Sequence, residues 1–131
     1  MYVYYCTFKV PQDNRAEFDR WMIGVTRECQ AQDGCVVYEY LTNPARPDEG
    51  VLFAAWATRE HYLAHRVFPA HVEMVALGSS TWGQHDLTNH VWPQAEGHIE
   101  VTYASTDESA DGELAERVRE FRRAHAAGAD G

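Results

Sequence analysis

The chain has 131 residues, of which 45% are hydrophobic, and its formal net charge at pH 7 is −9. This length predicts one domain with a single sizeable core, and this composition excludes a disordered chain. The excess of acidic groups repels phosphates, so we expect neither a nucleic acid nor a membrane as partner. Three cysteines without C-x-x-C spacing, and an N-terminal stretch unlike a signal peptide, predict a cytoplasmic protein.

The first thirty residues predict a strand and a helix. Residues 2–10 are rich in aromatic and β-branched side chains and stop before Pro11, which is typical of a strand. Asn14 and Glu17 then have the spacing of a capping box at the start of a helix of about 16 residues. The apolar side chains of this helix recur with helical spacing, at Phe18, Met22, Val25 and Cys29.

The middle of the chain predicts a hairpin and a second helix. Segments 35–43 and 51–58 have the composition of strands, and the turn between them is rich in proline. Thr58 is the expected N-cap of a helix over about 59–76. Because a proline inside a helix removes a hydrogen bond, we expect Pro69 to kink or split this helix.

The last third of the chain predicts a loop, a strand and a helix. Residues 78–97 lack clear periodicity, so we expect a long loop and a candidate lid. Residues 98–105 alternate and predict a fourth strand, and a final helix is expected over about 111–126. One face of that helix carries Leu114, Val118, Phe121 and His125. We expect a domain over 1–104, followed by an acidic linker and helical extension over 105–131.

The order strand, helix, strand, strand, helix, strand predicts an α+β protein with the ferredoxin-like, split βαβ arrangement. Its four-stranded antiparallel sheet would carry helices on one face only. Apolar and aromatic side chains nevertheless point both ways along the second strand, as in Tyr38 and Tyr40 against Val37 and Leu41. We therefore expect a homodimer in which a second copy covers the bare face.

The stretch DGCVVYEYLTNPARPDEGVLFAAWATREHYLAHRVFPAH, residues 33–71, resembles the antibiotic biosynthesis monooxygenase family. The shared features are a Gly-Cys pair before a Tyr-Glu strand, a strand ending in Trp, and a short helix with an Ala-His pair. The opening strand and first helix fit as well, so the resemblance covers about residues 1–77. It implies a dimeric α+β barrel with a pocket between helices and sheet. It also implies oxidation of phenolic rings, often polyketide anthrones or naphthols, to quinones with O₂ and without flavin, haem or metal.

In the polyketide-oxidising members of that family, a Trp at the end of the third strand and a Tyr six residues later line the pocket. These features fall on Trp56 and Tyr62. The chain departs from the pattern at two other positions. Leu52 stands where those members have a pocket Asn, and Ala76 stands where they have a pocket Arg.

Cofactor-free oxygenation needs a base that deprotonates the substrate and a pocket that excludes water. His65 is the expected base, because it belongs to the Ala-His pair and lies one turn beyond Tyr62. Tyr62 would donate a hydrogen bond to the substrate oxygen, and Trp56 would stack on the substrate rings. The further residues expected to bind substrate are Arg66, His71, Trp82 and Tyr38.

Metal and haem are alternatives that the sequence disfavours. His61 and His65 share one helix face and could bind a metal together with His71, His85 or His90. The stretch HYLAH lacks the Glu of a zinc protease, and isolated histidine pairs are common on helices, so we expect no metal ligands. Haem-degrading relatives use a helical His close to the place of His71. Their helical Trp would fall on His65 and their first-strand Asn is missing, so haem is not expected.

Two other functions stay open. A cyclase or isomerase on the same barrel would use the same acid and base groups without O₂, and a non-catalytic protein would only bind an aromatic ligand. Each candidate residue also has a purely structural interpretation. Trp56 and His65 would be packing residues, Tyr62 would direct its hydroxyl to water, and Trp82 and Trp92 would form a satellite core. The thiols expected to be small buried groups are Cys6, Cys29 and Cys35.

Overall fold

The computed structural model describes residues 1–93 and 97–130, with side chains described up to residue 126. Its strands are β1 (Tyr2–Lys9), β2 (Cys35–Asn43), β3 (Arg46–Trp56), β4 (His85–Trp92) and β5 (Ile99–Ser105). Its α-helices are α1 (Arg15–Gln30), α2 (Arg59–Arg66), α3 (Pro69–Trp82) and α4 (Gly112–Asp130). Among these described helices, each is too short or too polar to cross a bilayer.

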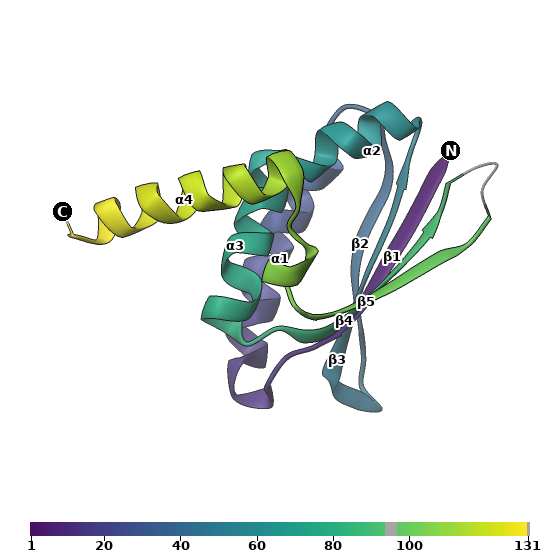
Figure 1. Ribbon diagram of the computed structural model, residues 1–131. Helices are drawn as coiled ribbons and strands as arrows, with labels where there is room; N and C mark the ends of the chain where they lie inside the picture. The colour runs from purple at the N-terminus through teal and green to yellow at the C-terminus, as the bar shows by residue number, and fades with distance from the viewer. Residues whose placement is uncertain (94–96, 131) are drawn as a thin grey trace.

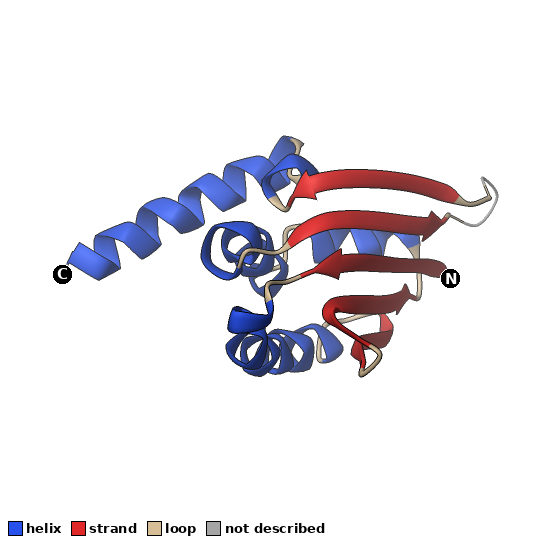
Figure 2. Ribbon diagram, turned by 90° about the horizontal axis from the view of Figure 1, so that it is seen from below, coloured by secondary structure: helices blue, strands red, loops and turns tan. Residues whose placement is uncertain are grey.

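One antiparallel sheet organises the molecule, with the strand order β2-β3-β1-β4-β5. Helices α1, α2 and α3 lie on one side of it and leave the other side bare (Figures 1 and 2). The fold is therefore the expected ferredoxin-like α+β arrangement, and β2 and β3 form the expected hairpin. The described sheet has five strands instead of the four expected, because β4 takes the fourth place beside β1 and β5 extends the edge.

The segment 78–97 is not the long loop that its sequence suggests, and residues 94–96 lie outside the described residues. Helix α3 continues to Trp82 and ends at Gly83, whose φ of 74° places it in the left-handed region that glycine tolerates best. The amide of Gly83 donates to Ser79 O, which closes the last turn, and β4 follows at once. The prediction of a lid in this segment is therefore wrong. Strand β4 lacks clear alternation because it is polar on both faces and only partly covered.

The second predicted helix is two helices. Thr58 caps α2 as expected, because its side chain accepts a hydrogen bond from His61 N. Pro69 splits the segment: Phe68 is extended, with φ −66° and ψ 138°, and Pro69 is the first residue of α3. The chain can therefore change direction between Arg66 and Pro69, and α3 runs past the expected end at residue 76.

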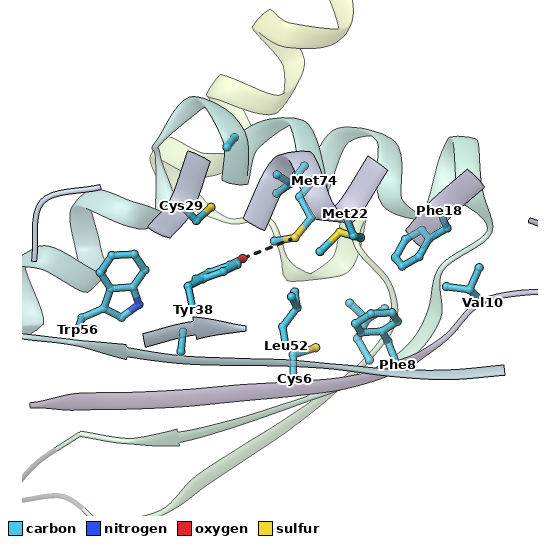
Figure 3. Close-up of a cluster of buried hydrophobic side chains, with 14 residues drawn as sticks. Cys6, Phe8, Val10, Phe18, Met22, Cys29, Tyr38, Leu52, Trp56 and Met74 are labelled. Carbon is cyan, nitrogen blue, oxygen red and sulfur yellow. Dashed lines mark hydrogen bonds between the residues drawn. The ribbon is translucent and has the colours of Figure 1, made fainter. Parts of the chain in front are cut away.

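The main core lies between α1, α3 and the sheet (Figure 3). The apolar stripe of α1 is buried as predicted: Phe18, Met22, Val25 and Cys29. The capping box is wrong. Asn14 makes no side-chain cap and instead donates from Nδ2 to Trp82 O at 2.8 Å, which ties the start of α1 to the end of α3.

The thiols are only partly as expected. Cys6 and Cys29 are buried, whereas Cys35 is half-buried at the start of β2. Burial raises the pKa of Cys6 and of Cys29 to about 12, so both stay protonated near neutral pH.

Helix α4 extends away from the sheet but begins on a small core of its own. The residues of that core are Val72, Val75 and Ala76 from α3 with Leu114 and Val118 from α4. Arg122 donates from Nη2 to Ala76 O at 2.9 Å, which fixes the next part of the helix. His125 is exposed and stacks on Phe121, with ring centroids 5.6 Å apart, so it does not extend the buried stripe.

Candidate active site

The aromatic end of the core pairs Trp56 with His65. Trp56 is the last residue of β3, faces the helices and is 0% exposed. His65, which is 5% exposed, projects from α2 and stacks on the indole with ring centroids 4.5 Å apart and planes 29° apart. The capped first turn of α2 sets the helix direction that brings the imidazole over the indole.

The hydrogen bonds of His65 define which nitrogen can accept a proton. Its Nδ1 lies 3.0 Å from Gln32 Oε1, in the turn after α1. Because an amide oxygen only accepts, Nδ1 carries the proton and Nε2 holds the lone pair. Among the described residues, Nε2 has no hydrogen-bond partner. The buried Nε1–H of Trp56 also lacks a partner there, so an unpaired donor and an unpaired acceptor belong to one stacked pair.

His71 and Tyr38 complete this aromatic cluster, which consists of Trp56, His65, His71 and Tyr38. The rings of His65 and His71 have centroids 4.6 Å apart, and His71 Nδ1 donates to Arg66 O at 2.8 Å. Tyr38, which is 3% exposed, lies with its ring centroid 5.4 Å from that of His65. Its hydroxyl points to Met74 Sδ at 3.9 Å (Figure 3). Three of the predicted substrate and base residues therefore converge on Trp56.

Buried His65 and half-buried His71 are both neutral near pH 7. Burial, followed by unfavourable electrostatic interactions with His71 and with the Arg66 guanidinium, lowers the pKa of His65 well below its usual value. Burial lowers the pKa of His71 to about 4, although its hydrogen bond to the Arg66 carbonyl raises it in part. Neutral imidazoles are proton acceptors, so the cluster has the protonation state that a general base needs.

Tyr62 lies one helical turn before both His65 and Arg66, at offsets of three and four residues, so its side chain neighbours each of them on α2. Tyr62 stacks on Tyr2 of β1, with ring centroids 4.2 Å apart and planes 19° apart. Arg66 donates to Asp111 Oδ1 at 2.6 Å and interacts electrostatically with Tyr62. These two residues form the more exposed edge of the site.

Sequence reasoning missed Tyr4 and Asn89. The Tyr4 ring centroid lies 6.1 Å from that of Tyr62, and its hydroxyl donates to Asn89 Oδ1 at 3.1 Å. Burial raises the pKa of Tyr4 well above its usual value, so this phenol stays protonated. The aromatic repeat of the first strand contained the signal for Tyr4. Asn89 had none, because its strand was expected to be a loop.

Trp82 lies apart from the aromatic cluster. It packs against Trp21 and Phe18, with ring centroids 5.7 and 6.5 Å away. Phe18 and Trp56 lie at opposite ends of the core in Figure 3. Trp82 is therefore a packing residue of the main core, away from His65, and does not form the satellite core with Trp92 that its structural interpretation describes, because Trp92 stacks on Tyr5 and His98.

Two of the grooves in the described part of the chain lie beside the helices that carry the aromatic cluster. A groove of about 310 Å³ between α2 and α4 reaches Arg66 and is closed on its far side by Asp111 and Leu114. A groove of about 700 Å³ lies between α1, α3 and α4, and its lining includes Glu28, Glu73 and Phe121. The smaller groove is the better candidate for substrate binding, because it is lined by residues of α2, the helix that carries His65.

His61 and His65 do not converge as metal ligands. The Nδ1 of His61 lies 2.8 Å from Thr58 Oγ1, and its Nε2 lies 3.4 Å from Asp33 Oδ2 at the surface. The His61 ring occupies the space where Gly34 would carry a Cβ. The two imidazoles therefore have separate partners, Thr58 and Asp33 for His61 and Gln32 for His65.

A sequence model of the family described as antibiotic biosynthesis monooxygenase matches residues 1–77, more than half of the chain. No curated protein matches the chain in sequence. A proposed antibiotic biosynthesis monooxygenase from Deinococcus radiodurans has a similar structure. It is 15% identical with a TM-score of 0.66, over 77% of this chain and 98% of that one.

Two further solved structures agree. A proposed monooxygenase of the same description from Nitrosomonas europaea is 20% identical, with a TM-score of 0.59 over 80% of this chain and 98% of that one. A mutant of SnoaB in which an asparagine is replaced by alanine also has a similar structure; SnoaB is a cofactor-independent oxygenase from Streptomyces nogalater. It is 15% identical, with a TM-score of 0.59 over 72% of this chain and 93% of that one. Identities this low support the fold alone. Together with the match over residues 1–77, they place the chain: it belongs to the antibiotic biosynthesis monooxygenase family.

Proposed function

We propose that the protein is a cofactor-independent monooxygenase that oxidises a polycyclic phenol or anthrone, of polyketide type, to a quinone with O₂. The observation that carries this proposal is the stacked pair of Trp56 and His65. Its buried indole N–H and its neutral imidazole Nε2 both lack a partner among the described residues. A donor beside an acceptor is what a phenol needs in order to lose a proton and remain bound as an anion.

The reaction follows from these groups. His65 Nε2 takes a proton from the activated substrate, and the resulting carbanion passes one electron to O₂. The two radicals combine and form a C–O bond. Loss of water from the peroxide leaves a carbonyl, so that a CH₂ group and O₂ yield C=O and H₂O. Tyr62 and Arg66 would stabilise the negative oxygen, and the surrounding aromatic side chains would exclude water.

Asn89 is a candidate replacement for the pocket Asn that is absent at the position of Leu52. Leu52 and Asn89 pair with Cys6 from its two sides, so they share one register row of the sheet. Both lie on the side that faces the helices, since Leu52 is in the core and Asn89 accepts from Tyr4. We infer that the side-chain amide of Asn89 takes the role of the pocket Asn that other members have at the position of Leu52. Ala76 is packed against α4, and Arg66 would supply the positive charge instead.

A homodimer is part of this proposal. The face of the sheet away from the helices carries apolar side chains without a covering layer. They include Val3, Tyr5, Leu41, Val51 and Phe53. A second copy of the chain would bury them and leave each helix-side site intact. Light scattering would test this: Phe53→Lys should be monomeric if this face is the interface.

The experiment that tests the function is oxygen uptake by chelator-treated protein with a panel of anthrones and naphthols. His65→Ala and Trp56→Phe are compared with His61→Ala, which removes a half-buried histidine of the same helix. Uptake that survives chelation and collapses only with His65 and Trp56 supports the oxygenase. Absence of uptake, together with ligand-induced quenching of tryptophan fluorescence, would replace it with a cyclase, an isomerase or a binding protein. Uptake abolished by chelation would make the reaction metal-dependent.

A further inference from the structure

The hairpin of β4 and β5 gathers two histidines and a glutamate on the face of the sheet away from the helices. His90 on β4 pairs directly with Glu100 on β5, and His98 precedes Glu100 by two residues. Residues two apart in an extended chain point to the same side. Asn89 points the opposite way, toward Tyr4. This group is therefore separate from the proposed oxygenase site.

The three side chains converge. One ligand atom from each of His90, His98 and Glu100 lies within 4.8 Å of the others. The closest pair is His90 Nδ1 and His98 Nε2, 3.0 Å apart, in rings whose planes differ by 5°. Two nitrogens at this distance share one proton. In a tetrahedral site with Zn–N bonds of roughly 2.0–2.1 Å, two ligand nitrogens lie about 3.3 Å apart. A metal ion can thus replace the shared proton when the nitrogens separate by a few tenths of an ångström and each ring turns to point its lone pair at the ion.

Neighbouring aromatic rings hold both imidazoles in place. Tyr5 stacks on His90 with ring centroids 4.2 Å apart, and Trp92 stacks on His98 with centroids 4.7 Å apart. Packing of this kind reduces the rotamer entropy that metal binding would otherwise cost. In the single chain His98 and Glu100 are exposed, so an ion can enter from solvent before a second copy covers this face of the sheet.

We propose that His90, His98 and Glu100 bind a divalent transition metal ion of the zinc type. Two imidazoles and one carboxylate are ligands that suit Zn²⁺ and its neighbours in the first transition row, and they leave coordination positions for water. The surface pair of His61 and Asp33 offers only two ligand groups and is the matched comparison.

The test is calorimetric titration of tag-free, chelator-treated protein with ZnCl₂. We expect one equivalent per chain. His98→Ala and Glu100→Gln should each weaken binding at least about tenfold, as expected when a metal site loses a ligand. His61→Ala should bind as the wild type does. Loss of binding in His61→Ala, full binding in His98→Ala, or no binding by the wild type would overturn the proposal.

A second readout uses the chain's own fluorophore. Because Trp92 stacks on His98, Co²⁺ in the site should quench its emission, and Trp92→Phe should lose that part of the quenching. Circular dichroism and the Tm confirm that the variants fold, since the substituted side chains are exposed or half-buried. Quenching that persists in His98→Ala would contradict the site. Neither readout depends on oxygen uptake, so the two proposals stand or fall separately.

Discussion

The imidazole of His65 lies flat on the indole of Trp56, with ring centroids 4.5 Å apart, and its Nδ1 is bound to Gln32. The contact has two consequences. It removes His65 from water, which keeps the ring neutral, and it fixes the tautomer, so that Nε2 is the basic nitrogen. A substitution that removes only this basic nitrogen would therefore separate an effect on catalysis from an effect on folding.

His65→Gln is that change. The glutamine amide can still donate to Gln32, but it cannot accept a proton at neutral pH. We expect kcat for oxygen uptake to fall by about 10²–10⁴-fold, the usual contribution of a general base. His61→Gln, on the same helix, should keep wild-type activity, and the Tm of both variants should stay close to that of the wild type. Full activity in His65→Gln would assign the base to another residue.

The free energy of unfolding should decrease in acid because of His71 and His65. The pKa of His71 is about 4 in the folded chain and 6.5 in its ordinary state. Above pH 6.5 both states are neutral and His71 contributes nothing. Between about 6.5 and 4 the unfolded chain binds a proton that the folded chain does not, so the free energy of unfolding falls, by up to about 3 kcal/mol. His65 acts in the same direction.

Urea unfolding at pH 7.5 and at pH 4.5 measures this effect. His71→Gln keeps a donor for Arg66 O but cannot titrate, so it should lose less stability between the two pH values than the wild type does. His125→Gln, at an exposed site on α4, should show the wild-type pH dependence. Equal pH dependence in His71→Gln and wild type would show that other groups control acid unfolding.

Asn89→Leu tests the amide in the register row of Leu52. Among the described residues, the Asn89 side chain is hydrogen-bonded to Tyr4 alone, through Oδ1, so its Nδ2 is available to a substrate oxygen. We expect kcat/KM to fall about tenfold or more, because a hydrogen bond to a charged oxygen contributes about 1.5–3 kcal/mol. Thr88→Val, on the other face of β4, is the control. Equal kcat/KM in both variants would exclude Asn89 from substrate binding.

Substituting alanine for two glycines, Gly83 and Gly24, should change the free energy of unfolding in opposite directions. Gly83→Ala puts a Cβ at φ 74°, and 3.1 Å from Pro11 Cγ, so we expect a loss of about 1–2 kcal/mol in the free energy of unfolding. Gly24 lies inside α1 and has open space around it, so Gly24→Ala should gain about 0.5–1 kcal/mol. Chemical denaturation measures both. A stabilising Gly83→Ala would show that the end of α3 does not need glycine.

Local patterns in the sequence determined much of the fold. The four apolar positions of α1, the β2–β3 hairpin, the Thr58 cap and the break at Pro69 each depend on interactions within a few residues of the chain. Such interactions leave a periodic or residue-specific signal. They also carried the family resemblance, and with it the expectation that Trp56 and His65 belong to one site; their stacking on each other was not predicted.

The tertiary structure decided the rest, because the relevant partners are distant in sequence. Asn14 satisfies Trp82 O instead of capping its own helix, since the end of α3 lies beside it. β4 is a strand because β1 and β5 supply hydrogen bonds on both sides, although its own residues alternate poorly. Asn89 meets Tyr4 across that same ladder. Burial, which sets the neutral charge of His65, exists only once these layers have packed.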